Sequence, residues 1–265
     1  MIGAMYTGIT GMDAAAASME VIGNNIANVN TAAFKTGTIS FASVFSENIG
    51  ALGISSGNEE GKGVQVVGLN SVWEQGALDS TMNSTDLCIS GQGFFQVVDG
   101  TSTYYTRAGQ FRYDENSCLV DPDGRVVQGF DALGALGDID IDEAAYEDVR
   151  IESDGVITAE DSITHIRANL FQVAVFDFPN NEGLKKVTGN LYAESTDSGT
   201  PLVPAGSVSG QDGVGQVRNN HLEMSNVDLA REFVDLIISQ RAFQANSRVI
   251  SSTSDMLTEV INIIR

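Results

Sequence analysis

Basic residues, histidine, cysteine and proline are all scarce in this sequence, and the scarcity excludes several classes of protein. The 265 residues hold 14 lysines and arginines against 35 acidic residues, which gives a formal net charge of −21. A field of that sign repels phosphate backbones, so free nucleic acid is excluded as a partner.

The few cysteines and histidines do not form a recognisable site. Cys88 and Cys118 are too few for a disulfide framework and too far apart for a metal knuckle, so we expect no bridge between them. His165 and His221 lie 56 positions apart without a helical pair motif. We interpret both as surface or structural residues rather than metal ligands.

Long apolar runs are also missing. No stretch reaches the roughly 18 uninterrupted apolar residues of a membrane-spanning helix. Residues 1–17 are apolar but have no basic n-region and no bulky hydrophobic run, so they are not expected to be a cleaved signal peptide. A protein of this kind that acts outside the cytoplasm would need a route other than general secretion.

What is present is an apolar content of 42% with 28 glycines, enough for a core and for many short turns. The acidic excess is uneven. Residues 47–220 carry 27 acids and 9 bases, whereas residues 1–46 carry 2 acids and 1 base. The solvated part is therefore the centre of the chain.

Both ends of the chain have a heptad pattern, in which apolar or small residues recur at alternating steps of three and four. The amino-terminal pattern consists of Ile2, Met5, Ile9, Met12, Ala16, Met19, Gly23 and Ile26. The carboxy-terminal pattern consists of Phe233, Leu236, Gln240, Phe243, Ser247, Ile250, Ser254, Leu257, Ile261 and Ile264. The sequence predicts a helix at each end, the second capped by Ser225 or Asn226.

Two arrangements of these helices remain open. Polar or small residues at Gln240, Ser247 and Ser254 weaken the carboxy-terminal seam, and several glycines lower the helicity of the amino-terminal one. The helices either close an intramolecular α-hairpin or stay loose in the monomer and order against other copies on assembly.

The centre of the chain has strand periodicity and turn signals about every ten residues. Phe94–Val98 and Tyr104–Thr106, joined through Asp99-Gly100, predict a hairpin, and Asp121–Gly124 predicts a turn. Further strands are expected at residues 64–67, 109–113, 125–129, 149–152 and 170–176.

The fold class is therefore α+β, with an irregular antiparallel β domain between paired terminal helices. The expected organisation is an amino-terminal helix in residues 1–35, an extended connection in 36–70, the β domain in 71–200, a return linker in 201–222 and a carboxy-terminal helix in 223–265.

Enzymatic motifs are incomplete, and no cofactor, metal or small-molecule substrate is expected. Asp138–Asp142 opens like a calcium loop, but Glu143 replaces the required glycine and Val149 the bidentate glutamate, so we interpret it as a solvated strand edge or turn. Gly91–Gly93 leads into a strand rather than a dinucleotide-binding helix. Ser207 and Ser209 miss the spacing of a nucleophile elbow.

Five segments resemble the signatures of bacterial flagellar hook and basal-body rod proteins, in the order of that family. They are 21–31 with Phe34-Lys35, 86–95 with 105–111, 189–192, 223–229 and 240–247. In the first, Asn24, Asn25 and Asn28 are spaced to present a ladder of amides beside the apolar seam. Ala33 stands where the family usually has glycine, which puts in doubt a positive φ there. Cys88 is interpreted as a small buried hydrophobe.

The resemblance implies a structural subunit and not an enzyme. It implies a helical homopolymer whose terminal helices pair as a coiled coil around a central channel, with the β domain outside. The implied partners are other rod, hook, hook-cap or junction proteins and the flagellar type III export apparatus. The residues expected to make subunit contacts are the seam positions given above together with Asn24, Asn25 and Asn28.

Hook and distal rod proteins differ little within these motifs. Residues 22–26 and 241–246 are closer to hook proteins, because rod proteins tend toward leucine in the first motif and Tyr-Glu in the second. The sequence therefore favours a hook subunit, a flexible universal joint that transmits torque from rod to filament. The alternative, which the length fits, is a distal rod subunit, a stiff drive shaft. A secreted hydrolase or adhesin built on the β domain is a more remote reading, and a regulatory binding module is a third.

Overall fold

The computed structural model describes residues 2–44, 47–48, 59–131, 134–141, 146–152, 154–162, 165–202 and 214–264. The chain divides into two compact units. Unit 1 comprises Met1–Val29, Thr36–Val72 and Val227–Arg265, and unit 2 comprises Asn30–Lys35 and Trp73–Asn226. None of the described helices is long and apolar enough to cross a membrane.

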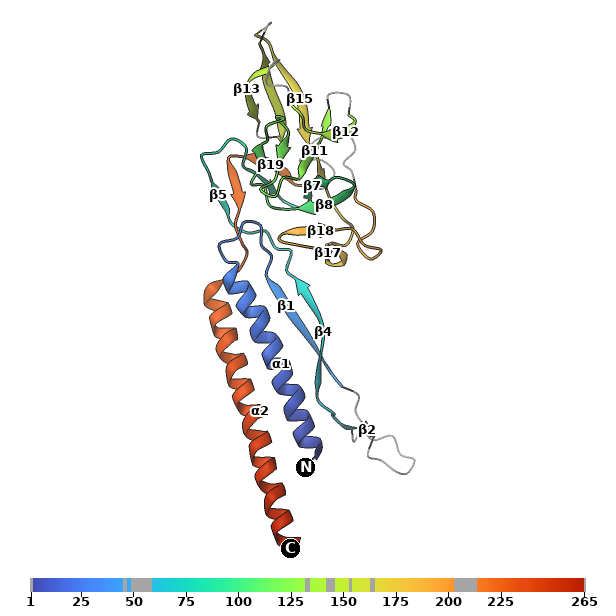
Figure 1. The fold of residues 1–265 in the computed structure, drawn as a ribbon, viewed down its shortest axis with the longest axis vertical. Coiled ribbons are helices and arrows are strands. Elements are labelled where there is room, and N and C mark those ends of the chain that lie inside the picture. Colours follow the sequence, from blue (N-terminus) through green and yellow to red (C-terminus); the bar gives the residue numbers. More distant parts are fainter. Residues whose placement is uncertain are drawn as a thin grey trace. The chain divides into compact units, whose positions relative to one another are not determined.

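Unit 1 is built on two helices that contact each other, as expected (Figure 1). α1 spans Ile2–Ala27 and α2 spans Leu229–Ile264. The cap of α2 is neither Ser225 nor Asn226 but Asp228, whose Oδ1 accepts hydrogen bonds from the backbone N–H groups of Ala230 and Arg231 at 2.9 and 3.4 Å. An aspartate also places negative charge at the positive end of the helix dipole, which the two other candidates do not.

A two-stranded antiparallel ribbon completes unit 1. β1 (Gly37–Ser43) pairs with β4 (Val64–Ser71), with a register shift between Ser40 and Phe41. The short strands β2 (Glu47–Asn48) and β3 (Glu59–Glu60) pair with each other. Both β1 and β4 contact α1. Since an isolated two-stranded ribbon is marginal in water, this helix contact is a source of its stability. Residues 36–70, expected as an extended connection, thus contain paired strands.

Unit 2 is antiparallel β structure. Its strands are β5 (Leu78–Ser80), β6 (Leu87–Ser90), β7 (Phe94–Asp99), β8 (Ser102–Thr106), β9 (Arg112–Tyr113), β10 (Leu119–Val120), β11 (Val126–Asp131), β12 (Leu136–Asp138), β13 (Tyr146–Ile151), β14 (Val156–Asp161), β15 (Arg167–Val173), β16 (Val175–Phe176), β17 (Lys185–Lys186), β18 (Leu191–Ala193), β19 (Gln216–Asn219) and β20 (His221–Glu223). A 3-10 turn covers Asn181–Gly183.

The main sheet of the described residues has the path β13-β14-β15-β11-β7-β8-β18-β17, with β9, β10, β12 and β16 attached to it. Separate pairs join β19 to β6 and β20 to β5. Segment 201–222 was expected to be a linker, yet its described part includes β19 and the start of β20. Residues 203–213, with Ser207 and Ser209, lie outside the described residues. The α+β class, with helices at both ends and antiparallel strands between, is confirmed.

The hairpin and the turn predicted in unit 2 are present, whereas one predicted strand is interrupted. The hairpin β7–β8 forms around Gly100, which has φ 60°. The turn at 121–124 also forms, because Asp121 Oδ1 accepts from the backbone N–H groups of Asp123 and Arg125. The strand expected over 170–176 is interrupted at Ala174, whose N–H donates to Gln128 instead. Segment 138–142 was expected to be a solvated strand edge or turn, and in its described part Asp138 and Asp140 are exposed whereas Ile139 and Ile141 are buried.

Two apolar clusters form the core of unit 2. The larger is formed mostly by residues of the main sheet and includes Phe95, Leu119, Val127 and Ile157. The smaller is aromatic and joins the rings of Trp73, Phe94, Tyr105, Phe178 and Tyr192, with centroid distances of 4.8–6.1 Å. Edge-on contacts of this kind add to the burial of large rings.

Ala33 corrects a sequence expectation. Its φ is 56°, in the left-handed region, although the alanine had argued against such a turn. The residue is buried, and its N–H donates to the carbonyl of Glu223 at 2.8 Å. Asn190 Nδ2 donates to the neighbouring carbonyl of Ala32 at 2.6 Å. Tertiary hydrogen bonds therefore hold a conformation that costs about 1–2 kcal/mol for a residue with a Cβ.

Candidate functional site

The face that joins α1 to α2 is made of small and polar residues. A Cβ on Gly8 would come within 2.9 Å of Ile250, and a Cβ on Gly11 within 2.6 Å of Asn246. Further along, the hydroxyls of Ser18 and Ser239 lie 3.1 Å apart. The partner moves backward along α2 as the position advances along α1, so the helices are antiparallel. Small residues on α1 let side chains of α2 lie directly against the α1 backbone.

This contact face is rotated by one residue from the predicted amino-terminal seam. Buried or contacting positions of α1 are Gly8, Gly11, Ala14, Ala15, Ser18, Ile22 and Asn25. All of them except Ala14 directly precede a predicted seam position, namely Ile9, Met12, Ala16, Met19, Gly23 and Ile26. One residue is a rotation of about 100° in a helix. The same shift of one residue is seen in α2. Its buried positions are Glu232, Ser239 and Thr253, and each directly precedes a predicted seam position, Phe233, Gln240 or Ser254. Ile250 belongs both to the predicted seam and to the observed contact face.

The rotation leaves part of the predicted seam in solvent. Ile9 is 44% exposed, Phe233 50% and Ile261 65%, and Phe243 is also exposed. Met5, Met12, Met19, Ile26, Leu236, Ile250 and Leu257 are half-buried, whereas Asn24 and Gln240 are exposed. The side chain of Ile2 is outside the described part of the chain. The predicted assembly residues are thus divided between the flank of the helix contact and its open side.

Sequence reasoning missed further exposed apolar residues on α2. Together with Phe233 and Phe243 they form what we call the outer face of α2: Leu229, Val234, Ile237, Ile238, Val249, Met256, Val260, Ile261 and Ile263. Single exposed apolar side chains are ordinary, whereas many of them along one helix are typical of an interaction surface. The signal in the sequence was the Phe-Val and Ile-Ile doublets, which no single stripe of a helix can bury.

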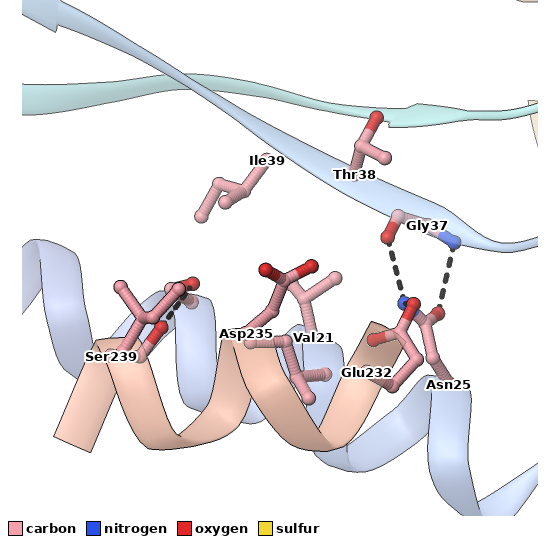
Figure 2. A pocket seen from close by; sticks show the side chains of 11 residues that line it. Val21, Asn25, Gly37, Thr38, Ile39, Glu232, Asp235 and Ser239 are labelled. Atoms are coloured by element: carbon pink, nitrogen blue, oxygen red, sulfur yellow. Dashed lines mark hydrogen bonds between the residues drawn. The ribbon is translucent and has the colours of Figure 1, made fainter. Parts of the chain in front are cut away.

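The expected ladder of three amides splits in two. Asn28 Nδ2 donates to both the carbonyl and the Oδ1 of Asn24 at 2.9 Å, one turn away. Asn25 points the other way and is 2% exposed. Its Nδ2 donates to Gly37 O at 2.9 Å and to Glu232 Oε1 at 3.2 Å, and its Oδ1 accepts from Gly37 N at 2.9 Å (Figure 2). One amide therefore joins α1, β1 and α2.

A pocket of about 210 Å³ lies beside Asn25 at the junction of these three elements. Its walls include Val21, Ile39 and Ile238, and its polar groups include the carboxylates of Glu232 and Asp235 (Figure 2). Burial raises the pKa of Glu232, an effect that the hydrogen bond from Asn25 partly opposes. The sequence did not single out either carboxylate, because both belong to an ordinary helical charge pattern.

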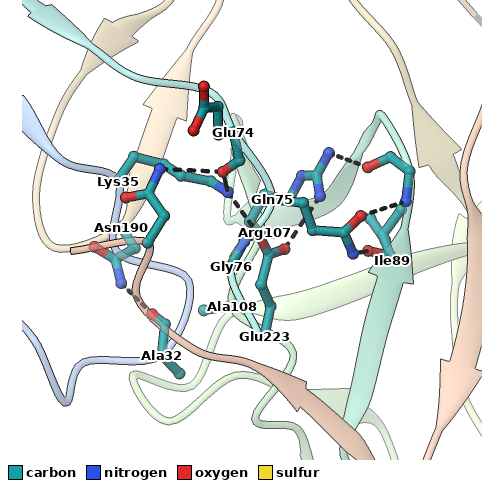
Figure 3. Close-up of polar contacts among 12 residues, drawn as sticks. Ala32, Lys35, Glu74, Gln75, Gly76, Ile89, Arg107, Ala108, Asn190 and Glu223 are labelled. Atoms are coloured by element: carbon teal, nitrogen blue, oxygen red, sulfur yellow. Dashed lines mark hydrogen bonds and ion pairs between the residues drawn. The ribbon is translucent and has the colours of Figure 1, made fainter. Parts of the chain in front are cut away.

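Unit 2 contains a buried ionic cluster centred on Glu223 (Figure 3). Its Oε1 lies 2.6 Å from Lys35 Nζ and accepts the N–H of Gly76 at 3.0 Å, and its Oε2 accepts from Arg107 Nη1 at 3.1 Å. Lys35 also donates to the carbonyl of Glu74 at 2.7 Å. Burial lowers the pKa of Lys35 although Glu223 raises it. All three charged residues stand in the quoted family motifs. The sequence therefore indicated each residue but not the contacts among them.

The described residues offer little for catalysis. They contain no group of three or more His, Cys, Asp or Glu that could hold a metal ion. Cys88 is buried and Cys118 half-buried, both as free thiols. His165 is exposed beside Glu160, and His221 contacts a backbone carbonyl through Nδ1. Asp142 and Glu143 of the calcium-like stretch lie outside the described residues.

Three family models match the chain in order. They are a flagellar basal-body rod protein model over residues 5–35, the D1 domain of the flagellar hook protein FlgE/F/G over 88–159, and the carboxy-terminal model of basal-body rod FlgEFG proteins over 218–263. The first and last fall largely on α1 and α2, and the second on the β domain.

Curated rod relatives match over all or nearly all of the chain, and a hook relative matches over part of it. The chain is 36% identical to the flagellar basal-body rod protein FlgG of Bacillus subtilis over 272 residues, covering 100% of both chains. It is 35% identical to FlgG of Agrobacterium fabrum, covering 97% of each. The flagellar hook protein FlgE of Treponema pallidum is 37% identical over 180 residues, which cover 64% of this chain and 39% of that one. With helices at both ends, a β domain between them and relatives of this kind, the chain belongs to the flagellar hook and basal-body rod protein family, a structural and not an enzymatic family.

Proposed function

We propose that this protein is a distal rod subunit of the flagellar basal body, polymerising into a helical tube that works as a stiff drive shaft. The observation that carries this proposal is the full-length match to FlgG rod proteins, with 31–36% identity over 97–100% of both chains. It favours the alternative of the sequence analysis over the hook subunit that the motifs at 22–26 and 241–246 had favoured.

The hook reading rested on a few side chains in two short motifs. The hook relative has a similar identity to this chain, 37%, but the match covers only 39% of its own length. A hook subunit of that kind carries most of its chain outside the shared part. The match along a whole rod protein therefore weighs more than the choice between leucine and isoleucine in one motif.

The outer face of α2 supports polymerisation. Residues such as Phe233 and Ile237 are at least half exposed in the monomer, and burying them against other copies is a favourable term of about 25 cal/mol per Å². Heterologous contacts that do not close into a ring generate a helical filament. The assembly residues are then the exposed seam positions Ile9, Phe233, Phe243 and Ile261 and the rest of this face.

The partners follow from that role. The subunit would contact further copies of itself, the rod and hook proteins that precede and follow it, and hook-cap or junction proteins, and would leave the cell through the flagellar type III export apparatus. No nucleic acid, cofactor or small-molecule substrate enters the proposal.

Electron microscopy of basal bodies from a strain that lacks the gene tests this function. A distal rod subunit predicts rods that stop short, with neither hook nor filament. A complete rod without a hook would overturn the rod assignment in favour of the hook, and intact flagella would overturn both. Restoring the gene should restore full-length rods.

A further inference from the structure

We propose that a pocket within unit 2 binds a carboxamide group, whose carbonyl accepts hydrogen bonds from Arg107 and Trp73 and whose N–H donates to Asn181. The pocket has a volume of about 260 Å³, and its walls include these three residues with Gly91 and Phe94. All of them belong to unit 2. The site goes beyond the proposed rod function and does not depend on it, because a hook subunit could carry it equally.

Three polar atoms of the pocket walls are buried and have no hydrogen-bond partner in the described part of the chain. They are Arg107 Nε, Trp73 Nε1 and Asn181 Oδ1. Arg107 as a whole is only 6% exposed. Buried polar groups without a partner are rare and costly. Two donors and one acceptor gathered at a single cavity therefore indicate a ligand that supplies the complementary atoms.

Arg107 cannot turn to satisfy its Nε–H elsewhere. Its Nη1 donates to Glu223 Oε2 at 3.1 Å and its Nη2 donates to the carbonyl of Gly91 at 2.6 Å (Figure 3). That loop is itself held, because Gly91 N donates to Gln75 Oε1 at 3.1 Å. The guanidinium carbon also lies 5.7 Å from the centroid of the Phe94 ring. Since the guanidinium is planar, these contacts fix the direction of the Nε–H bond as well.

The unpartnered atoms favour an amide over a carboxylate as the ligand. Arginine and tryptophan N–H groups only donate, and the amide oxygen of Asn181 only accepts. A carboxamide has one carbonyl oxygen with two lone pairs and an N–H group, so it matches all three atoms. A carboxylate would be attracted by the buried cluster, in which Lys35 and Arg107 share Glu223 as counter-charge, but it has no proton for Asn181.

The pocket also suits the short apolar stem of a small amide. The rings of Trp73 and Phe94 lie edge to face, with centroids 5.3 Å apart, and give apolar surface beside the polar atoms. The volume is below the roughly 300–1,000 Å³ that is usual for small-molecule sites, which indicates a group the size of one side chain. Two sources carry this chemistry: a small free amide, and the asparagine or glutamine side chain of a docked protein.

Nuclear magnetic resonance of the purified full-length chain tests the site, since Trp73 is the single tryptophan and its indole N–H gives one signal. Propionamide, which copies the end of a glutamine side chain, should shift this signal in a saturable way. Propionate, a carboxylate of the same shape, should bind about tenfold more weakly. Equal or tighter binding of propionate overturns the amide assignment. No saturable shift with either probe overturns the site, since water alone then serves its polar atoms.

Substitution of Asn181 tests the acceptor. Asn181→Leu keeps both donors, so it should weaken propionamide binding about tenfold and remove the preference over propionate. Asn116→Leu is the matched control, at an exposed position outside the pocket walls, and should bind like the unaltered protein. The backbone signals report whether each variant is folded. A folded Asn181→Leu variant that keeps the full preference for the amide would overturn the assigned hydrogen bonding.

Two blocked tripeptides distinguish the sources of the amide. Ala-Gln-Ala with acetyl and N-methylamide ends should bind at least as tightly as propionamide if a docked protein supplies the group. Ala-Glu-Ala with the same ends should then bind about tenfold more weakly, because only the side chain differs. Binding of propionamide but of neither peptide would assign the pocket to a small free amide. Either result upholds the site, whereas equal binding of the two peptides would overturn recognition of a side-chain amide.

Discussion

The backbone of Gly11 in α1 lies against the side chain of Asn246 in α2, so that a Cβ on the glycine would come within 2.6 Å of the Asn246 amide nitrogen. Gly8 stands in the same relation to Ile250, at 2.9 Å. A larger residue at either position would therefore require a side chain of α2 to move aside. The glycines that weaken α1 as an isolated helix are thus the residues that allow it to pair.

Replacing Gly11 with valine should force the helices apart and destabilise unit 1 by about 1–3 kcal/mol, the usual cost of overpacking. Gly23→Ala is the matched control, because nothing lies within 4 Å of a Cβ there. It should stabilise α1 by up to about 1 kcal/mol. Urea unfolding followed by far-ultraviolet circular dichroism measures both. Equal effects of the two substitutions would contradict the close packing at Gly11.

Replacing Glu223 with glutamine should destabilise unit 2 by about 3–5 kcal/mol, because Lys35 and Arg107 would then be buried without a counter-charge. Asp123→Asn is the control. It removes an exposed partner of Arg125, whose loss should cost at most about 1 kcal/mol. Denaturant unfolding followed through Trp73 fluorescence reports on unit 2. A Glu223→Gln variant as stable as the control would show that the cluster contributes little.

Glu232 gives unit 1 a pH dependence of defined sign. Burial raises the pKa of Glu232 in the folded state above its value in the unfolded chain. At a pH between these two pKa values, the folded state therefore binds more protons than the unfolded state. Stability from this group is present below the unfolded pKa and is lost as the pH rises through the folded pKa. Glu232→Gln removes the titration and keeps an acceptor for Asn25.

The measurement is the difference in unfolding free energy between the unaltered protein and Glu232→Gln as a function of pH. As the pH rises from about 4.5, the ordinary glutamate pKa, the unfolding free energy of the variant should increase relative to that of the unaltered protein. The difference should become constant above the pKa of Glu232 in the folded state. A pH-independent difference would contradict the raised pKa. Asp255→Asn, at an exposed position of α2, is the control.

Replacing Ile237 with aspartate should prevent assembly and leave the monomer intact. The side chain is 56% exposed, so the folded monomer should change by no more than about 0.5 kcal/mol. In a polymer the same charge would be buried without a partner. Sedimentation of the purified chain over a range of concentrations measures assembly, and circular dichroism measures the fold. Gln244→Glu, also exposed on α2 and outside the predicted seam, should assemble normally, and assembly of Ile237→Asp would show that this face stays open.

The sequence by itself determined the helices at both ends, the antiparallel β structure between them and the family. Each rests on local information: heptad spacing, strand alternation, turn residues such as Asp121 and Gly100, and motif order. The tertiary structure decided which face of each helix is used. Heptad counting ranks positions by apolarity, but the contact between the helices uses small residues such as Gly11 and Ser18 and leaves Phe233 exposed.

Long-range partners decided the rest. Asn25 turns away from its neighbouring amides because Gly37 and Glu232 complete its hydrogen bonds, and neither is near it in sequence. Ala33 adopts a positive φ because Glu223 accepts its N–H, and Glu223 itself is buried because Lys35 and Arg107 neutralise it. Such positions depend on residues that only folding brings together, so no local pattern in the chain could specify them.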